Sequence, residues 1–99
     1  MPRPRTKLRV HPGEILHEEF LVPLAMSARA LAAKIGVPAN RLTEIIAERR
    51  GITADTAIRL GRYFGTSPEF WLNMQTTHDL VKAQAETDYS KVPKAGKAA

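Results

Sequence analysis

Cysteine is absent from this chain of 99 residues, which excludes disulfides, thiolate metal sites and a cysteine nucleophile. No run approaches the ~20 apolar residues that a membrane-spanning helix needs, so no membrane association is expected. The N-terminal segment MPRPRTKLRV is basic, but it has no apolar stretch of the kind found in signal peptides. Together these absences predict a cytoplasmic protein.

The residue groupings of an enzyme are missing as well. The sequence has no nucleophile with a nearby base, no glycine-rich phosphate loop and no convergent pair of carboxylates. His11, His17 and His78 are scattered along the chain, and His17 with Glu14 or Glu18 does not make a set of metal ligands. We therefore expect no catalysis, no bound metal and no cofactor.

What the chain does contain is enough apolar sequence for one modest core, and an uneven distribution of charge. Hydrophobic residues make up 43 % of the sequence, which suits a single domain. The formal net charge is +5. Both ends and residues 27–62 are basic, whereas residues 13–24 and 67–90 are acidic. A charged segment is usually a solvated face, but a basic one can also neutralise DNA phosphates.

The most informative stretch is SARALAAKIGVPANRLTEIIAERR at residues 27–50. It predicts two short helices joined at Gly36, where glycine reaches a positive φ without steric cost. One register places the apolar residues of both helices on facing sides: Leu31, Ala32, Ile35, Leu42, Ile45 and Ile46. This pattern is typical of a helix-turn-helix, whose second helix enters a DNA groove. A helical hairpin that only packs would show the same spacing.

Five helices are expected in all, with no strand. The first helix is expected to begin at Pro12 and to end at Pro23, and Ser27 caps the second. The third has Pro38 in its first turn and stops at Gly51, and the fourth runs from a Thr53 cap to Gly65. Ser67-Pro68-Glu69 starts the fifth. We expect a basic N-terminal arm over residues 1–10, a DNA-binding domain with a dimerisation helix over 11–83, and a mobile tail over 84–99.

Apolar side chains at helical spacing define the expected core. The inward-facing residues predicted outside the helix-turn-helix are Ile15, Leu16, Phe20, Leu21, Ala54, Ala57, Ile58, Gly61, Phe64, Phe70, Trp71 and Met74. Trp71 could anchor an interface, but a single tryptophan on a helical apolar face is more often a core residue. We favour the core, with part of the ring near a dimer contact.

Four segments together resemble the HigA antitoxins, a family that includes the GraA antitoxin. They are HPGEILHEEFLVPL at 11–24, the helix-turn-helix, RRGITADTAIRLGRYFG at 49–65 and TSPEFWLNMQ at 66–75. HPGEIL and SPEFWL are the most specific, since a generic repressor does not need them. The resemblance implies an all-α, compact five-helix fold of the phage-repressor type, with disordered basic termini.

The resemblance also implies partners. A HigA-type protein is expected to be a homodimer that binds double-stranded operator DNA in its own promoter and represses its own operon. It is also expected to bind and neutralise a RelE/ParE-like ribonuclease toxin such as HigB or GraT. Two alternatives stay open: a stand-alone transcriptional regulator without a toxin, and an interaction module that binds only the toxin.

The outer face of the second helix of the motif supplies the candidate base contacts. At ~100° per residue, Asn40 and Glu44 point away from the core, and Arg41 and Thr43 lie on the flanks. Asparagine suits adenine, arginine guanine, glutamate cytosine and threonine a thymine methyl group. The predicted base contacts are Ala39, Asn40, Arg41, Thr43 and Glu44. Alternatively, Glu44 pairs with Arg41 within the helix.

Candidate phosphate contacts flank this face. Arg29 lies in the first turn of the helix that crosses the DNA backbone, and Arg49 and Arg50 lie at the far end of the recognition helix. Thr53 can add its amide and hydroxyl at a helix N-terminus. The predicted phosphate contacts are Ser27, Arg29, Arg49, Arg50 and Thr53. For arginines on a small domain, a merely solvated position is the competing interpretation.

Overall fold

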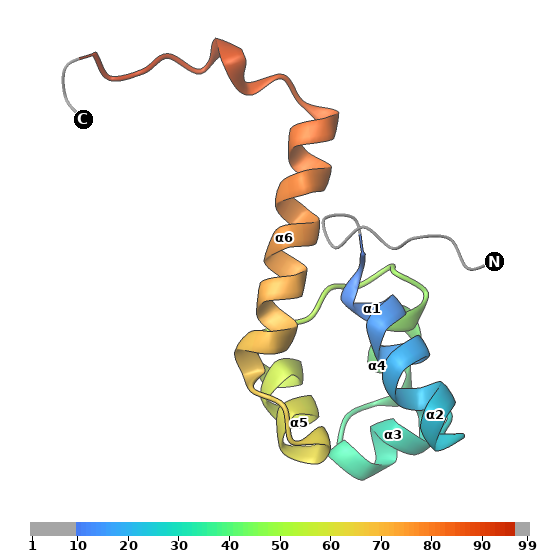
Figure 1. Ribbon diagram of the computed structural model, residues 1–99. Coiled ribbons are helices and arrows are strands. Elements are labelled where there is room, and N and C mark those ends of the chain that lie inside the picture. The colour runs from blue at the N-terminus through green and yellow to red at the C-terminus, as the bar shows by residue number, and fades with distance from the viewer. Residues whose placement is uncertain (1–9, 97–99) are drawn as a thin grey trace.

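The computed structural model describes residues 10–96, and within this range every regular element is helical (Figure 1). Residues 1–9, which hold most of the expected basic arm, and residues 97–99 lie outside the described part of the chain. The elements are α1 Pro12–Ile15, η1 Leu16–Leu21, α2 Val22–Leu24, α3 Ala28–Ile35, α4 Ala39–Ile46, α5 Ala54–Phe64, α6 Pro68–Glu86 and η2 Tyr89–Lys91. The expected five-helix, all-α fold is confirmed, because α1, η1 and α2 follow one another without a break as the first helix.

The first helix contains a wide turn and runs past the proline that was expected to end it. η1 is π-helical, and the Val22 amide donates to the carbonyl of His17, five residues back. Proline lacks an N–H, and its ring would clash with a carbonyl in a regular α-helix. The wide turn lies just before Pro23, and the helix continues to Leu24. It ends where Ala25 takes a left-handed φ of 51°.

Two boundaries of α4 also differ from the sequence expectation. Pro38 lies one position before the helix, with an extended backbone, instead of in its first turn. The helix ends at Ile46, before Gly51, and Glu48 takes a φ of 63° in the following turn. Gly51 has no positive φ; a Cβ there would lie 3.0 Å from the side chain of Gln75. Long-range packing, and not a glycine stop, therefore explains the small residue.

The predicted core is largely correct, but three residues predicted to face inward are exposed: Ala54 and Ile58 of α5, and Phe70 of α6. Leu16, Leu31, Leu42, Ile45, Ala57 and Trp71 are fully buried. Ile58, however, is 50 % exposed, whereas Leu60 and Thr56 are buried. The expected stripe took Ile58 because it is apolar and next to Ala57. The side of α5 that faces the other helices instead includes Thr56, a polar residue that periodicity passes over.

Helix α6 closes the core with its first turns and then projects from the globule (Figure 1). The Ser67 hydroxyl accepts from the Phe70 amide at 3.1 Å, as the start signal predicted. Trp71 is 0 % exposed, and its Nε1 donates to the Thr66 hydroxyl at 2.8 Å. No part of its ring is left for a dimer contact. The helix continues to Glu86, and the chain beyond it is exposed up to residue 96.

The start of α1 is held against α6 and α4. His11 is buried, and its Nδ1 accepts from the Gly13 amide at 2.9 Å, which caps the helix. Its ring meets that of His78 edge-on, with centroids 4.8 Å apart. These two histidines, scattered in the sequence, are therefore neighbours in the fold. A Cβ on Gly13 would lie 1.9 Å from the carbonyl oxygen of Ile45, so only glycine permits this approach of α1 to α4.

Candidate nucleic-acid interface

Helices α3 and α4 have the geometry of a helix-turn-helix. The Ser27 hydroxyl accepts from the Ala30 amide at 3.0 Å and caps α3. Gly36 ends this helix with a φ of 78°, and the amides of Gly36 and Val37 both donate to the Ala32 carbonyl. Ala32 is 1 % exposed, so the small side chain lies where the two helices approach. These local signals confirm the register predicted from Gly36.

On α4, the polar residues predicted for base contact lie on the side away from the core. Leu42 and Ile45 are fully buried, whereas Asn40 is exposed and Ala39 and Thr43 are half-buried. The Thr43 hydroxyl donates to the backbone carbonyl of Asn40 at 3.4 Å. The face that would enter a groove therefore presents Asn40 near the N-terminus of the helix.

Arg41 is held by a residue outside its own helix. Its Nη1 donates to Oδ2 of Asp55, in the first turn of α5, at 2.6 Å. The alternative that Arg41 pairs with Glu44 is wrong. Glu44 instead pairs with Arg50, whose Nε and Nη2 lie 3.0 Å and 2.8 Å from the Glu44 carboxylate. Both partners, Asp55 and Arg50, lie outside α4, so helical spacing alone could not identify them.

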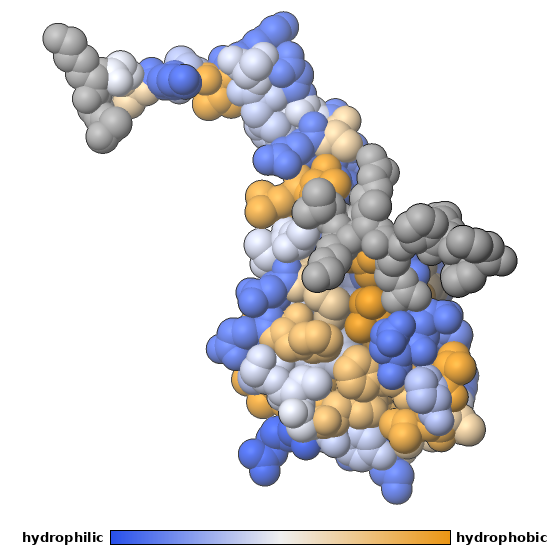
Figure 2. All heavy atoms as spheres, viewed as in Figure 1, coloured by the Kyte–Doolittle hydropathy of each residue, from blue (hydrophilic) through white to orange (hydrophobic). Residues whose placement is uncertain are grey.

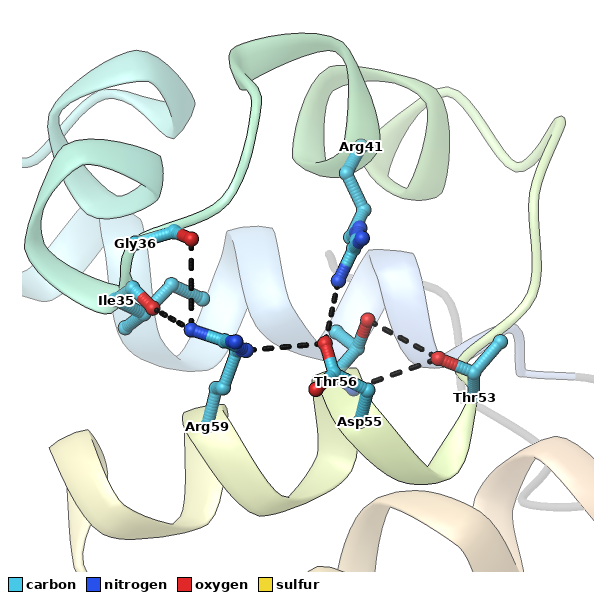
Figure 3. A network of polar contacts seen from close by, with 7 residues as sticks. All are labelled: Ile35, Gly36, Arg41, Thr53, Asp55, Thr56 and Arg59. Atoms are coloured by element: carbon cyan, nitrogen blue, oxygen red, sulfur yellow. Dashed lines mark hydrogen bonds and ion pairs between the residues drawn. The ribbon is translucent and has the colours of Figure 1, made fainter.

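Asp55 also binds a second arginine, Arg59, and so connects α4 to the turn after α3 (Figure 3). The sequence alone did not indicate Arg59 as a candidate. The Nε of Arg59 donates to the same Oδ2 at 3.0 Å. Its Nη1 donates to the backbone carbonyls of Ile35 at 2.8 Å and Gly36 at 3.4 Å. Hydrogen bonds from Arg41 and then from Arg59 lower the pKa of Asp55, because they favour its charged form.

The predicted phosphate contacts differ in the partners that they already have within the chain. Ser27 and Thr53 cap α3 and α5, and each accepts an amide of its own helix. Arg29 and Arg49 are exposed and pair with no acid within residues 10–96. Arg50 differs from Arg49 because Glu44 already holds it. Unpaired surface arginines at these positions leave two positive charges available to an anion.

Comparison with known proteins agrees with this geometry. The helix-turn-helix family model matches residues 18–71. Virulence-associated protein I of Dichelobacter nodosus is 56 % identical over 77 residues, which is 78 % of this chain and 71 % of that protein. The solved structure of Pseudomonas aeruginosa antitoxin HigA with the higBA promoter is 51 % identical, with a TM-score of 0.76 over 77 % of this chain and 83 % of that one. Antitoxin GraA in complex with its operator is 43 % identical, with a TM-score of 0.75 over 87 % and 85 %.

The chain belongs to the HigA-type helix-turn-helix family. The motif match and the fold identify a DNA-binding regulator class and not an enzyme class. Both solved relatives are described with the DNA of a promoter or an operator. The resemblance drawn from HPGEIL and SPEFWL is thereby confirmed.

This HigA-type protein also carries an apolar groove, formed by the first helix and α6. The groove has a volume of about 820 Å³, and its apolar lining residues are Val10, Ile15, Phe20, Phe70 and Met74. Figure 2 shows hydrophobic side chains gathered over the globular part on the face in view. Phe70 remains 40 % exposed, although its ring packs on Trp71 with centroids 5.0 Å apart. The groove is thus an apolar surface separate from the polar face of α4.

Neither a metal centre nor a membrane span is found in the part that the structure describes. Across residues 10–96, histidines and acids nowhere gather in a group of three that could hold a metal. In the same range, every helix is too short or too polar to cross a lipid bilayer.

Proposed function

We propose that this protein is a cytoplasmic antitoxin that binds the operator of its own operon as a homodimer and neutralises a ribonuclease toxin. The observation that carries the DNA-binding part is the polar face of α4, where Asn40 is exposed. A helix-turn-helix positions this face, and its core residues Leu31, Leu42 and Ile45 are fully buried. Exposed arginines lie in the first turn of α3, at Arg29, and in the segment after α4, at Arg49. Relatives described with operator or promoter DNA support the same conclusion.

Base contacts and phosphate contacts are proposed for the residues predicted from the sequence. We assign base reading to Ala39, Asn40, Arg41, Thr43 and Glu44, and phosphate contact to Ser27, Arg29, Arg49, Arg50 and Thr53. Asn40 is the central reader because it is exposed near the N-terminus of α4. Arg49 is the central phosphate contact because it is exposed and has no acidic partner in residues 10–96.

Two single substitutions separate these roles. Asn40→Ala should cost ~1–3 kcal/mol on a duplex from the DNA upstream of its own gene and relax the preference at one base pair. Arg49→Ala should weaken binding to that duplex and to random DNA equally, and lower the salt slope by about one. The measurement is fluorescence anisotropy at several salt concentrations. Equal loss on both duplexes for Asn40→Ala would show that α4 does not read bases.

A second copy of the chain is needed because one short recognition helix covers too few base pairs to select an operator. We propose that the two copies meet along α6 and the adjoining apolar groove, with half-sites about one helical turn, ~34 Å, apart. Phe70 and Leu80, at 40 % and 55 % exposed, are the large apolar side chains on this helix that a partner could cover. Leu80→Glu should yield monomers in analytical ultracentrifugation and abolish binding to the palindrome. Tight binding by a strict monomer would contradict this assembly.

The toxin part of the proposal is supported by the family and is tested separately. The adjacent gene is expected to encode a small basic protein, and co-expression with that product should yield a stable complex and relieve growth arrest. If no neighbouring product binds, whereas the operator is bound in a salt-dependent manner, the protein is a stand-alone regulator. If the neighbour binds but the upstream DNA does not, the protein is a toxin-binding module only.

A further inference from the structure

One carboxylate oxygen accepts hydrogen bonds from two arginines on different helices. Oδ2 of Asp55 accepts a hydrogen bond from Nη1 of Arg41 at 2.6 Å and another from Nε of Arg59 at 3.0 Å. Arg59 also donates to the carbonyls of Ile35 and Gly36, at the end of α3. Figure 3 shows the guanidinium groups of both arginines directed toward Asp55 from the two sides. The arginine of the recognition helix is thereby tied to the turn that positions this helix.

We propose that Asp55 is a specificity-determining positioning residue that holds Arg41 for reading a guanine and withholds it from random phosphates. The inference rests on the proposed operator binding. Asp55 engages one nitrogen of the Arg41 guanidinium, and a guanidinium has five N–H donors in a planar fork. The remaining donors suit the O6 and N7 acceptors of guanine, which demand a fixed direction.

Two physical effects give Asp55 this role. An arginine side chain that is already held loses less freedom when it binds, and this favours the ligand that matches its fixed direction. The carboxylate also offsets the charge of Arg41, so that this arginine adds little to the sequence-independent attraction of the DNA backbone. Both effects increase the ratio of operator affinity to random-DNA affinity. Neither requires Asp55 to touch DNA.

Because Asp55 lies at the surface, it can be substituted to test DNA selectivity without unfolding the protein. Its side chain is 55 % exposed, and exposed ion pairs contribute little to stability. Asp55→Asn removes the charge but keeps the size of the side chain and one oxygen acceptor. The melting temperature should therefore change little, and a change in DNA selectivity would not reflect unfolding.

The test compares a duplex from the protein's own upstream DNA with a random duplex of equal length, by fluorescence anisotropy across a salt series. For Asp55→Asn we expect a roughly tenfold fall in the ratio of the two affinities, within the range of one bidentate base contact. The salt slope on random DNA should rise by about one, because Arg41 becomes free to neutralise a phosphate. Preference should relax at a single base pair.

A double-mutant cycle identifies Arg41 as the intermediary. In an Arg41→Ala background, Asp55→Asn should leave the affinity ratio unchanged, since the arginine that it positions is gone. Glu48→Gln is the matched control, because it removes one acid from the turn after α4 without touching Arg41. It should shift both affinities equally. Arg41→Lys keeps the charge without the planar fork and should lose the same base preference, which provides a second test if Asp55→Asn misfolds.

Two results would overturn the inference. In the first, Asp55→Asn keeps the wild-type affinity ratio while it remains folded. In the second, it lowers the ratio equally with and without Arg41, which would reflect a general charge effect. Wild-type protein that binds both duplexes equally would instead refute the proposed operator binding, and this inference with it. The wild-type measurement therefore distinguishes the two failures.

Discussion

Truncation of Trp71 to alanine removes the largest side chain of the buried core. The indole is 0 % exposed and packs beside Phe20 and Phe70, with ring centroids 5.1 Å and 5.0 Å away. Phe or Trp truncation in a core costs ~3–5 kcal/mol. The loss falls toward the top of that range, because the Thr66 hydroxyl also loses the donor that lies 2.8 Å away, a hydrogen bond worth ~0.5–1.5 kcal/mol. We therefore expect a loss of free energy of unfolding of ~4–5 kcal/mol.

A loss of this size is a large part of the ~5–15 kcal/mol that a domain has in total. At ~4–8 °C per kcal/mol for a small domain, the melting temperature should fall by roughly 15–40 °C. Circular dichroism melting and urea unfolding measure the effect. DNA binding and toxin neutralisation should be lost together near physiological temperature, because the fold itself is lost.

Two controls set the scale for Trp71→Ala. Phe70→Ala should cost clearly less, since Phe70 is already 40 % exposed. Removal of residues 91–99 should leave the melting temperature nearly unchanged, because residues 91–96 are exposed. A Trp71→Ala protein that melts like the wild type but no longer binds toxin would refute the reasoning. It would show that the ring anchors a partner.

Two further predictions concern the start of the first helix. Burial, followed by the charge of His78, lowers the pKa of His11 from its ordinary value of 6.5, so the unfolded chain binds more protons just below that pH. The free energy of unfolding should therefore rise with pH up to about 6.5, by at most ~1.4 kcal/mol per pH unit. His11→Asn should remove this dependence on pH, and the asparagine oxygen can still cap α1. An unchanged slope in pH-dependent denaturation would show that His11 is not the titrating group. Gly13→Ala should cost ~1–3 kcal/mol or more in urea unfolding, because the new Cβ would collide with the backbone carbonyl of Ile45; wild-type stability would show that α1 can shift freely.

The elements that could be predicted are those whose signals are local. Ser27, Thr53 and Ser67 each cap a helix through an amide three residues ahead, so a short sequence window contains both partners. Gly36 takes the positive φ that the turn requires. The burial of Trp71 followed from its place on an apolar helical face.

The errors arose where a distant residue or an unusual backbone decides the outcome. The end of α4 depends on a turn in which Glu48, not a glycine, adopts a left-handed φ. The π-helical turn ahead of Pro23 has no counterpart in apolar periodicity. Thr56 is buried although it is polar, and its neighbour Ile58 is exposed. Periodicity weighs residue type, whereas burial depends on which side of α5 meets the other helices.

The sequence by itself determined the helix-turn-helix, its register and the polar identity of the outer face of α4, because these depend on helical spacing and on caps a few residues apart. Only the tertiary structure decided how that face is charged. Arg41 is held by Asp55, fourteen residues ahead, and Glu44 by Arg50, six residues ahead. Such pairs form when the fold brings separate segments within hydrogen-bonding distance, and no period along the chain encodes that distance. The proposed selectivity of Arg41 therefore depends on the packing of α5 against the turn after α3.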